Sequence, residues 1–425
     1  MGALARPARM NIQRASRALL TVLGGQLAVQ AVGALVGFLI VRAMPVTEYA
    51  LYTQALSCLT LATVLADGGI GSATLALSGP RAQDAPALAR IMATARVWRL
   101  RLAAISLCLA VGVFLFLTWR LATPWPVMLA TAPVLVPLAL GQMLAHLAET
   151  PLRARGAVSW LQGLHLQAAL FRGALSVAAL LLLPATWLVL SATALAQGWH
   201  LRRVLGRCRS EGLADGAPDP ALAPQFRHAL ARAMPGAIYY CLSGQLGVLL
   251  VSIFGNAQAV AGLGALGRFG IAYSVLIAVL GYLFTPWLSR RPDAGLRQAY
   301  LLALTAFGTM VAGTLAAALL LRTPLLALLG PEYAGLGHEF SLLMLTGALA
   351  TLGGAAHQLA AARNVYAPPY SGIASCVVVQ VLAILSQDVS TLSGVLWMTI
   401  IVNTWTLLLP AGHFLLRPRL PERLR

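Results

Sequence analysis

The sequence contains no lysine, so all 30 of its basic residues are arginines. A Walker A loop requires a lysine, which excludes an ATPase of that kind. Acidic residues are also scarce, at 12, and charged residues make up only 10% of the chain. At 59% hydrophobic residues, the chain has too little polar surface for an ordinary soluble protein. We therefore predict an all-α polytopic membrane protein.

Signatures of catalysis and metal binding are missing as well. The five cysteines are odd in number and far apart, which predicts neither a disulfide framework nor a metal site. His338-Glu339 lacks the second histidine of a zinc protease. Gly262, Gly264 and Gly267 match a dinucleotide-binding pattern, but no strand precedes them. The sequence thus predicts no catalytic residues and no metal.

Twelve apolar runs each provide the roughly 20 residues that cross a bilayer. The first, residues 18–41, is too long for a signal-peptide core. All but five arginines lie at the termini or in every second gap between runs, which predicts that both termini are cytoplasmic. The predicted helices cover about residues 17–42, 48–77, 98–119, 125–147, 157–183, 185–204, 226–254, 257–288, 298–321, 335–362, 370–387 and 391–415.

The longest polar gap, residues 205–225, divides these spans six and six and is rich in turn-forming residues. A shift of 212 residues superposes Gly24 on Gly236 and keeps one register across the halves. We therefore expect two six-helix lobes, 1–204 and 226–425, joined by a cytoplasmic linker. An even number of crossings makes this a parallel repeat, with a pseudo-twofold axis along the membrane normal and a substrate path between the lobes.

Two arginines break the topology pattern because they lie near the middle of predicted helices, Arg172 and Arg268. A guanidinium at the bilayer centre costs at least about 2.5–3.5 kcal/mol, so it faces a partner or a watery cavity. Either each pairs with a carboxylate or carbonyl, or both line a cavity that attracts an anionic substrate. His165 lies two helical turns before Arg172 on the same face. It is either a cavity group or proton carrier, or a buried hydrogen-bonded histidine.

Asp67 begins the segment Asp-Gly-Gly-Ile-Gly and is interpreted as the only acidic residue well within a span. It is a candidate for ion coupling, gating or pairing with a cavity arginine; the alternative is a cap on a helix broken by glycines. Gln26, Gln30, Tyr240 and Gln245 are further candidates for lining a cavity, with interhelical hydrogen bonds as the alternative.

Several segments resemble one membrane-protein family. They are the turn at residues 43–52 (Ala-Met-Pro-Val-Thr-Glu-Tyr-Ala-Leu-Tyr), Asp-Gly-Gly-Ile-Gly at 67–71, and the segments 254–264, 284–288 and 329–334. In order and spacing the chain resembles the polysaccharide and oligosaccharidyl-lipid flippases of the MOP superfamily, the Wzx-type O-antigen translocases.

That resemblance implies a flippase rather than an enzyme. Such a protein moves an undecaprenyl-pyrophosphate-linked oligosaccharide across the bacterial inner membrane by alternating access. The resemblance implies no cofactor, and transport in this family is often driven by an H⁺ or Na⁺ gradient. It also implies a monomeric transport unit, whose partners are the lipid-linked oligosaccharide, membrane lipids and polysaccharide polymerase machinery. The net charge of +18 is spread over short loops, which favours anionic lipid headgroups and predicts no nucleic-acid partner.

Two alternatives remain open. A MATE-like multidrug and cation antiporter of the same superfamily favours acidic cavity groups, whereas two of the three mid-span charges here are arginines. A membrane polysaccharide polymerase or ligase is expected to have a large outer loop, and the predicted outer gaps are short.

Overall fold

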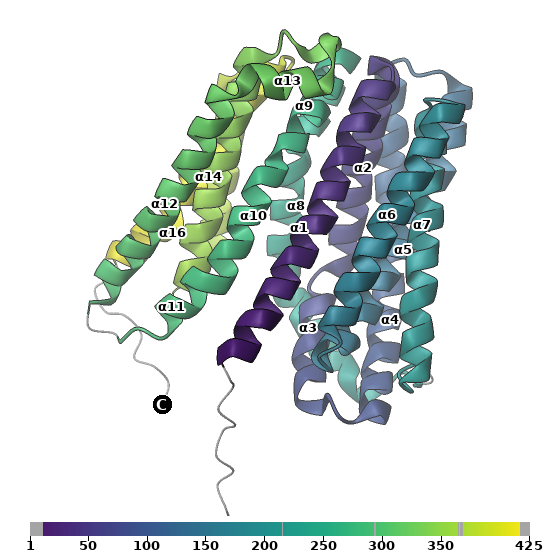
Figure 1. The fold of residues 1–425 in the computed structure, drawn as a ribbon, viewed down its shortest axis with the longest axis vertical. Coiled ribbons are helices and arrows are strands. Elements are labelled where there is room, and N and C mark those ends of the chain that lie inside the picture. Colours follow the sequence, from purple (N-terminus) through teal and green to yellow (C-terminus); the bar gives the residue numbers. More distant parts are fainter. Residues whose placement is uncertain (1–11, 215, 293–294, 364, 366–368, 417–425) are drawn as a thin grey trace, which may run out of the picture.

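The computed structural model describes residues 12–214, 216–292, 295–363, 365 and 369–416, and all regular structure in these ranges is helical. Figure 1 shows two groups of roughly parallel helices, with α1 (Ile12–Ala43) running between them. Ten described helices are long and apolar enough to cross a membrane. The predicted all-α membrane architecture is confirmed.

The first half continues with long helices in antiparallel order (Figure 1). They are α2 (Val46–Asp67), the short α3 (Ile70–Ser78), α4 (Ala85–Arg120), α5 (Trp125–Ala154), α6 (Val158–Leu182) and α7 (Thr186–Ser210). The second half contains α8 (Ala223–Phe254), α9 (Ala257–Gly267), α10 (Ile271–Val279), α11 (Thr285–Ser289), α12 (Leu296–Leu320), α13 (Arg322–Leu329), α14 (Gly337–Ala361), α15 (Pro369–Ser386) and α16 (Leu392–Leu416).

Several predicted helices differ from the observed ones, and the one predicted at 98–119 already begins at Ala85. The helix predicted at 48–77 is broken at Gly68 and Gly69, both with positive φ, and Met234 and Ala233 of α8 occupy the space that side chains would need there, so glycine fits both positions. The span predicted at 257–288 is found at Ala257–Ser289, but its α-helix changes to a 3₁₀ turn at Arg268–Gly270 and to a π-helical turn at Leu280–Phe284. The gap predicted at 148–156 is helical as far as Ala154, since α5 continues through it.

The ends of the helices differ in charge. The turns that contain Arg81, Arg155 and Arg291 lie at one end, here called the arginine-rich end. The short helix α13 lies across the other, the α13 end (Figure 1). This separation follows the alternate-gap pattern seen in the sequence.

The two halves meet along a seam formed by α2 with α8 and α9, and by α1 with α10 and α13. The two halves pack tightly where Gly264 of α9 faces Thr53 of α2: a Cβ on Gly264 would stand 2.1 Å from the Thr53 Oγ1. Helix α8 also contacts α3 and α4 of the first half and α15 and α16 of the second. The predicted lobe boundary at residues 205–225 therefore stays a prediction.

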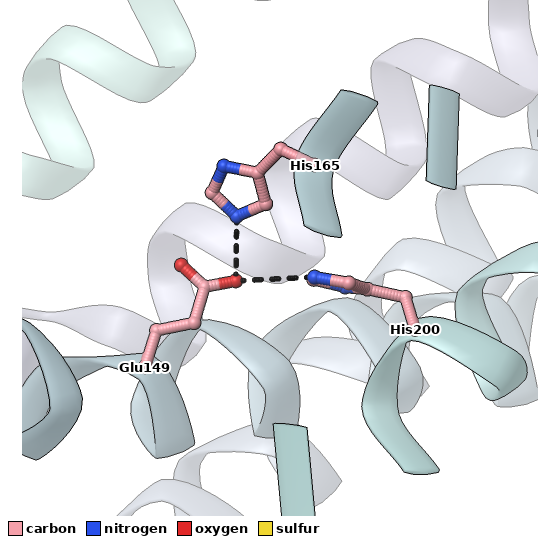
Figure 2. Close-up of side chains that lie close together, drawn as sticks. All are labelled: Glu149, His165 and His200. Carbon is pink, nitrogen blue, oxygen red and sulfur yellow. Dashed lines mark hydrogen bonds and ion pairs between the residues drawn. The ribbon is translucent and has the colours of Figure 1, made fainter. Parts of the chain in front are cut away.

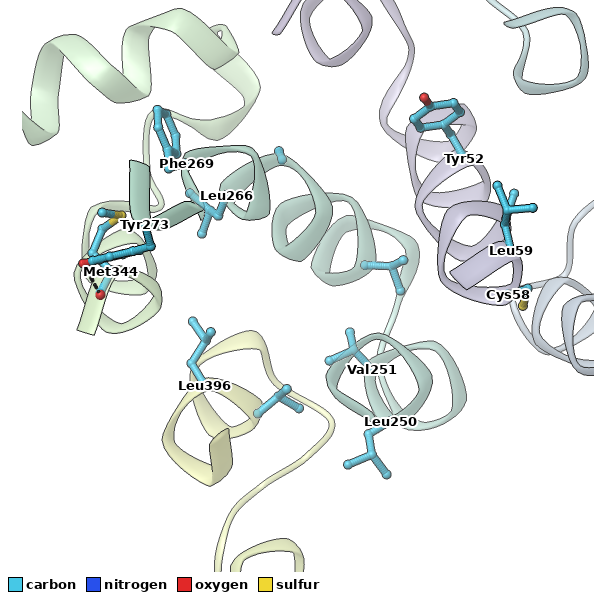
Figure 3. Close-up of a cluster of buried hydrophobic side chains, with 14 of the residues drawn as sticks. Tyr52, Cys58, Leu59, Leu250, Val251, Leu266, Phe269, Tyr273, Met344 and Leu396 are labelled. Carbon is cyan, nitrogen blue, oxygen red and sulfur yellow. Dashed lines mark hydrogen bonds between the residues drawn. The ribbon is translucent and has the colours of Figure 1, made fainter. Parts of the chain in front are cut away.

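An apolar core extends across this seam. Figure 3 shows buried side chains of α2, α8, α9, α10, α14 and α16 gathered in one cluster. Tyr273 enters it from α10, and its hydroxyl donates to the Met344 carbonyl at 2.7 Å, which satisfies the polar atom of a buried aromatic ring. Packing of this kind holds in place the helices that carry the polar groups of the seam.

Candidate functional site

A small polar pocket of about 200 Å³ lies in the seam between the halves. Helix α2 supplies its hydroxyl groups, α8 an amide and the end of α9 a guanidinium, and such groups hydrogen-bond to a polar ligand. The lining residues are Thr53, Leu56, Ser57, Thr60, Gln245, Gly264, Gly267 and Arg268.

Arg268 reaches from the second half across the seam to the first. Its Nε donates a hydrogen bond to the Tyr49 hydroxyl at 3.1 Å, and its guanidinium carbon lies 6.0 and 5.7 Å from the ring centroids of Tyr49 and Tyr52. Its Cδ lies 3.2 Å from where a Cβ on Gly37 would be. Both tyrosines are buried. Aromatic faces attract a cation without neutralising it, so the positive charge of Arg268 remains available.

Arg172 lies against α1 one helical turn from the point where Arg268 contacts it. Its Nη2 lies 4.0 Å from the position of a Cβ on Gly33 of α1, whereas Arg268 lies beside Gly37. The side chain of Arg172 is exposed. In the part of the chain that the structure describes, no carboxylate forms an ion pair with Arg172 or Arg268. The two mid-helix cations therefore lie one helical turn apart along one face of α1, and neither has an ion-pair partner among the described residues.

Asp67 lies at the break between α2 and α3. Its carboxylate accepts hydrogen bonds from the backbone N–H groups of Gly69 and Gly71 and forms an ion pair with Arg99 of α4. Arg99 is only 3% exposed. Asp67 thus caps the broken helix and also pairs with an arginine, although not with either mid-helix arginine. Its role in ion coupling or gating stays a prediction.

A second polar centre joins α5, α6 and α7 toward the arginine-rich end (Figure 2). The Oε1 of Glu149 lies 3.0 Å from the Nε2 of His165 and 3.5 Å from the Nε2 of His200. Its Oε2 accepts a hydrogen bond from Arg153 at 2.5 Å. Only 1% of the Glu149 side chain is exposed. We call these residues the Glu149–His165–His200 cluster.

Sequence reasoning found His165 but missed its partners. Glu149 falls between the helices predicted at 125–147 and 157–183, but α5 continues past it to Ala154. The interpretation of Asp67 as the only acidic residue well within a span is therefore wrong. One signal was present. Glu149, His165 and His200 occupy three consecutive antiparallel helices, each in the half nearer the arginine-rich end.

The remaining predicted residues are spread along α1 and α8. Gln26 is exposed and Gln30 half-buried on α1. Tyr240 is 61% exposed on α8 and packs edge-on against Tyr239. Among the described contacts, none joins these three predicted residues to Arg172 or Arg268. Gln245 alone of the amide and tyrosine candidates lines the seam pocket.

Comparison with known proteins finds solved structures with a similar fold but no match by sequence. No family model and no curated protein matches the sequence. An inward-facing multidrug resistance MATE family transporter of the MOP superfamily is similar in structure, with a TM-score of 0.68, 13% identity, and coverage of 91% of this chain and 93% of that one. The lipid II flippase MurJ, in an inward closed conformation, also gives 0.68, with 10% identity and coverage of 91% and 85%.

A third similar structure is the MATE multidrug transporter DinF-BH in complex with R6G, with a TM-score of 0.64, 18% identity and coverage of 97% of both chains. At such identities the likeness establishes the fold alone. Together with the ten apolar helices, it shows that the chain is a multi-pass, all-α membrane protein with the twelve-span, two-lobe fold that these transporters share.

Proposed function

We propose that this protein moves an undecaprenyl-pyrophosphate-linked oligosaccharide from the cytoplasmic to the outer leaflet of a bacterial inner membrane, by alternating access and without covalent catalysis. The arginine-rich end then faces the cytoplasm, as the positive-inside rule requires. The observation that carries the proposal is Arg268, a cation in a polar pocket between the two halves with no carboxylate partner among the described residues.

Charge favours a phosphate-containing substrate. The planar guanidinium of an arginine donates paired hydrogen bonds to phosphate oxygens and keeps its proton. Arg172, one turn away along α1, adds a second cation for the other part of a diphosphate or for an acidic sugar. Desolvating these charges is costly, and a bound anion offsets that cost.

The seam is closed at the α13 end. Thr53 and Gly264 touch there, and Arg268 is held by Tyr49 in the first turn of α2. The pocket, at about 200 Å³, is smaller than the roughly 300–1,000 Å³ of an ordinary small-ligand site and is too small for an oligosaccharide. The glycan must therefore enter space that opens when the halves separate, while the lipid tail stays in the bilayer.

A cation antiporter is the second candidate, because two of the similar structures are multidrug transporters. Its weakness lies in the carboxylates. Neither lines the seam pocket: Asp67 is paired with Arg99 at the break after α2, and Glu149 lies in the separate cluster on α5, α6 and α7. Coupling to an H⁺ or Na⁺ gradient, a monomeric transport unit and contact with a glycan polymerase remain parts of the proposal.

The test uses a deletion strain complemented with wild type, Arg268→Ala, Arg268→Lys or the control Arg120→Ala, at equal protein levels. Arg120 lies at the end of α4, outside the seam pocket. We expect lipid-linked oligosaccharide to accumulate on the cytoplasmic face with Arg268→Ala, because loss of a charged hydrogen bond of about 1.5–3 kcal/mol lowers affinity roughly 10–100-fold. Arg268→Lys should be intermediate and Arg120→Ala normal. Undiminished surface glycan with Arg268→Ala, or drug hypersensitivity of the deletion strain with normal glycan, contradicts the proposal.

A further inference from the structure

The Glu149–His165–His200 cluster brings three metal-ligand atoms to one point, one from each of three helices (Figure 2). The three atoms lie within 4.8 Å of one another, and Oε1 stands 3.0 and 3.5 Å from the two Nε2 atoms. Ligands about 2.1 Å from a tetrahedral zinc ion stand roughly 3.4 Å apart. The two separations from Oε1, 3.0 and 3.5 Å, are close to the edge length of such a site.

His200 supplies an independent observation. Its side chain is 7% exposed, yet its Nε2, aimed at Oε1, has no hydrogen-bond partner among the described residues. A buried ring nitrogen left without a partner costs about 1–3 kcal/mol. His165 does not share this deficit, since its Nε2 lies at hydrogen-bond distance from Oε1. A cation between the three atoms would satisfy His200.

The surroundings of the carboxylate favour metal binding as well. Arg153 holds the other oxygen, Oε2, and so fixes the orientation of the Glu149 carboxylate while leaving Oε1 for an ion. The Arg153 side chain is 53% exposed, so water screens its positive charge. His165, at 27% exposed, is the most accessible member of the cluster and marks the side from which an ion and a water ligand can approach.

We propose that Glu149, His165 and His200 bind one divalent transition-metal ion of the zinc class, with a fourth position left for water. Two imidazoles and one carboxylate suit Zn²⁺ and Co²⁺ rather than Mg²⁺ or Ca²⁺, which prefer oxygen ligands alone. The ion ties α5, α6 and α7 together in the half nearer the arginine-rich end. This proposal is independent of the transported substrate.

The test uses the full-length protein in lipid nanodiscs after removal of metal with a chelator. Zn²⁺ is titrated calorimetrically, and Co²⁺ is followed by its visible absorption. We expect one saturable ion per chain and a melting temperature that rises with Zn²⁺, because the ion binds only the folded state. Arg153→Gln should weaken binding about 10–100-fold, and His200→Gln and His165→Gln by more.

His146→Ala is the matched control, since this histidine lies on α5 one turn before Glu149 but is exposed and outside the cluster. It should bind Zn²⁺ as wild type does. The metal-free melting temperature of each variant reports whether it folds. The metal site is refuted if wild type binds no more Zn²⁺ than His200→Gln. It is also refuted if replacing His200 changes how the melting temperature depends on pH but does not change Zn²⁺ binding; the cluster then carries protons alone. Glycan accumulation tests the flippase separately, so the two proposals fail independently.

Discussion

The Nε of Arg268 donates a hydrogen bond to the hydroxyl of Tyr49, 219 positions away in the sequence, and this bond joins the two halves near the α13 end. It gives Arg268 two roles in the proposed cycle. The arginine holds the seam closed when no anion is bound, and it is released when a phosphate competes for its donors. Closure and substrate binding then use the same guanidinium.

Tyr49→Phe keeps the ring but removes the hydroxyl that accepts from Arg268. Loss of a hydrogen bond to a charged group costs about 1.5–3 kcal/mol, so the closed state should lose population at least about tenfold. Spin-label distances between the α13 ends of α2 and α9 measure this change. Tyr282→Phe, an exposed tyrosine away from the seam pocket, should leave those distances unchanged. Identical distributions for both variants would contradict the closing role.

Gly264→Ala should prevent tight closure of the seam, because the added Cβ would stand 2.1 Å from the Oγ1 of Thr53. Gly267→Ala is a matched control one helical turn away, where a Cβ meets nothing within 4 Å. We expect cysteine pairs across the seam to cross-link more slowly in Gly264→Ala only. Equal cross-linking rates in the two variants would show that this contact does not limit closure.

Asp67→Ala should destabilise the fold, because it leaves Arg99, only 3% exposed, without its partner and removes the cap on α3. Since the Asp67 side chain is itself 39% exposed, we expect a loss of about 1–3 kcal/mol rather than the larger loss for a fully buried pair. Thermal melting in detergent measures it. The double variant Asp67→Ala with Arg99→Met should recover part of the stability; a further loss would argue against the ion pair as the cause.

Asp388, in the turn before α16, gives a prediction for pH. Hydrogen bonds from the Ser390 hydroxyl and then its backbone N–H hold the pKa of Asp388 below its ordinary value. A lowered folded-state pKa means that the turn is stabilised above the ordinary aspartate pKa and loses this support as the pH falls through the lowered one. The protection of the Ser390 amide against hydrogen exchange, measured relative to an unfolded peptide at the same pH, should therefore fall at acidic pH. Asp388→Asn should remove the pH dependence, whereas Glu332→Gln, in the α13–α14 turn, should not.

Local patterns in the sequence carried most of the helix assignment, because a helix in a bilayer satisfies its own backbone and needs only a sufficient apolar length. The break at Gly68 and Gly69 was only an alternative to one helix at 48–77, because glycine permits a positive φ without requiring it. The end of α5 could not be predicted from the sequence. Pro151 and the charged residues around it favour a loop, but Pro151 lies within the last turn of α5, where packing against α7 holds the helix.

The sequence by itself determined the spans, the alternate placement of arginines and the two exceptional charges, Arg172 and Arg268, because hydropathy and charge are properties of single positions. Only the tertiary structure decided what those charges meet. Tyr49 reaches Arg268 across the seam, and His165 and His200 converge on Glu149 from two further helices. Such contacts depend on which faces of distant helices pack together, and that information is not stored in any one segment.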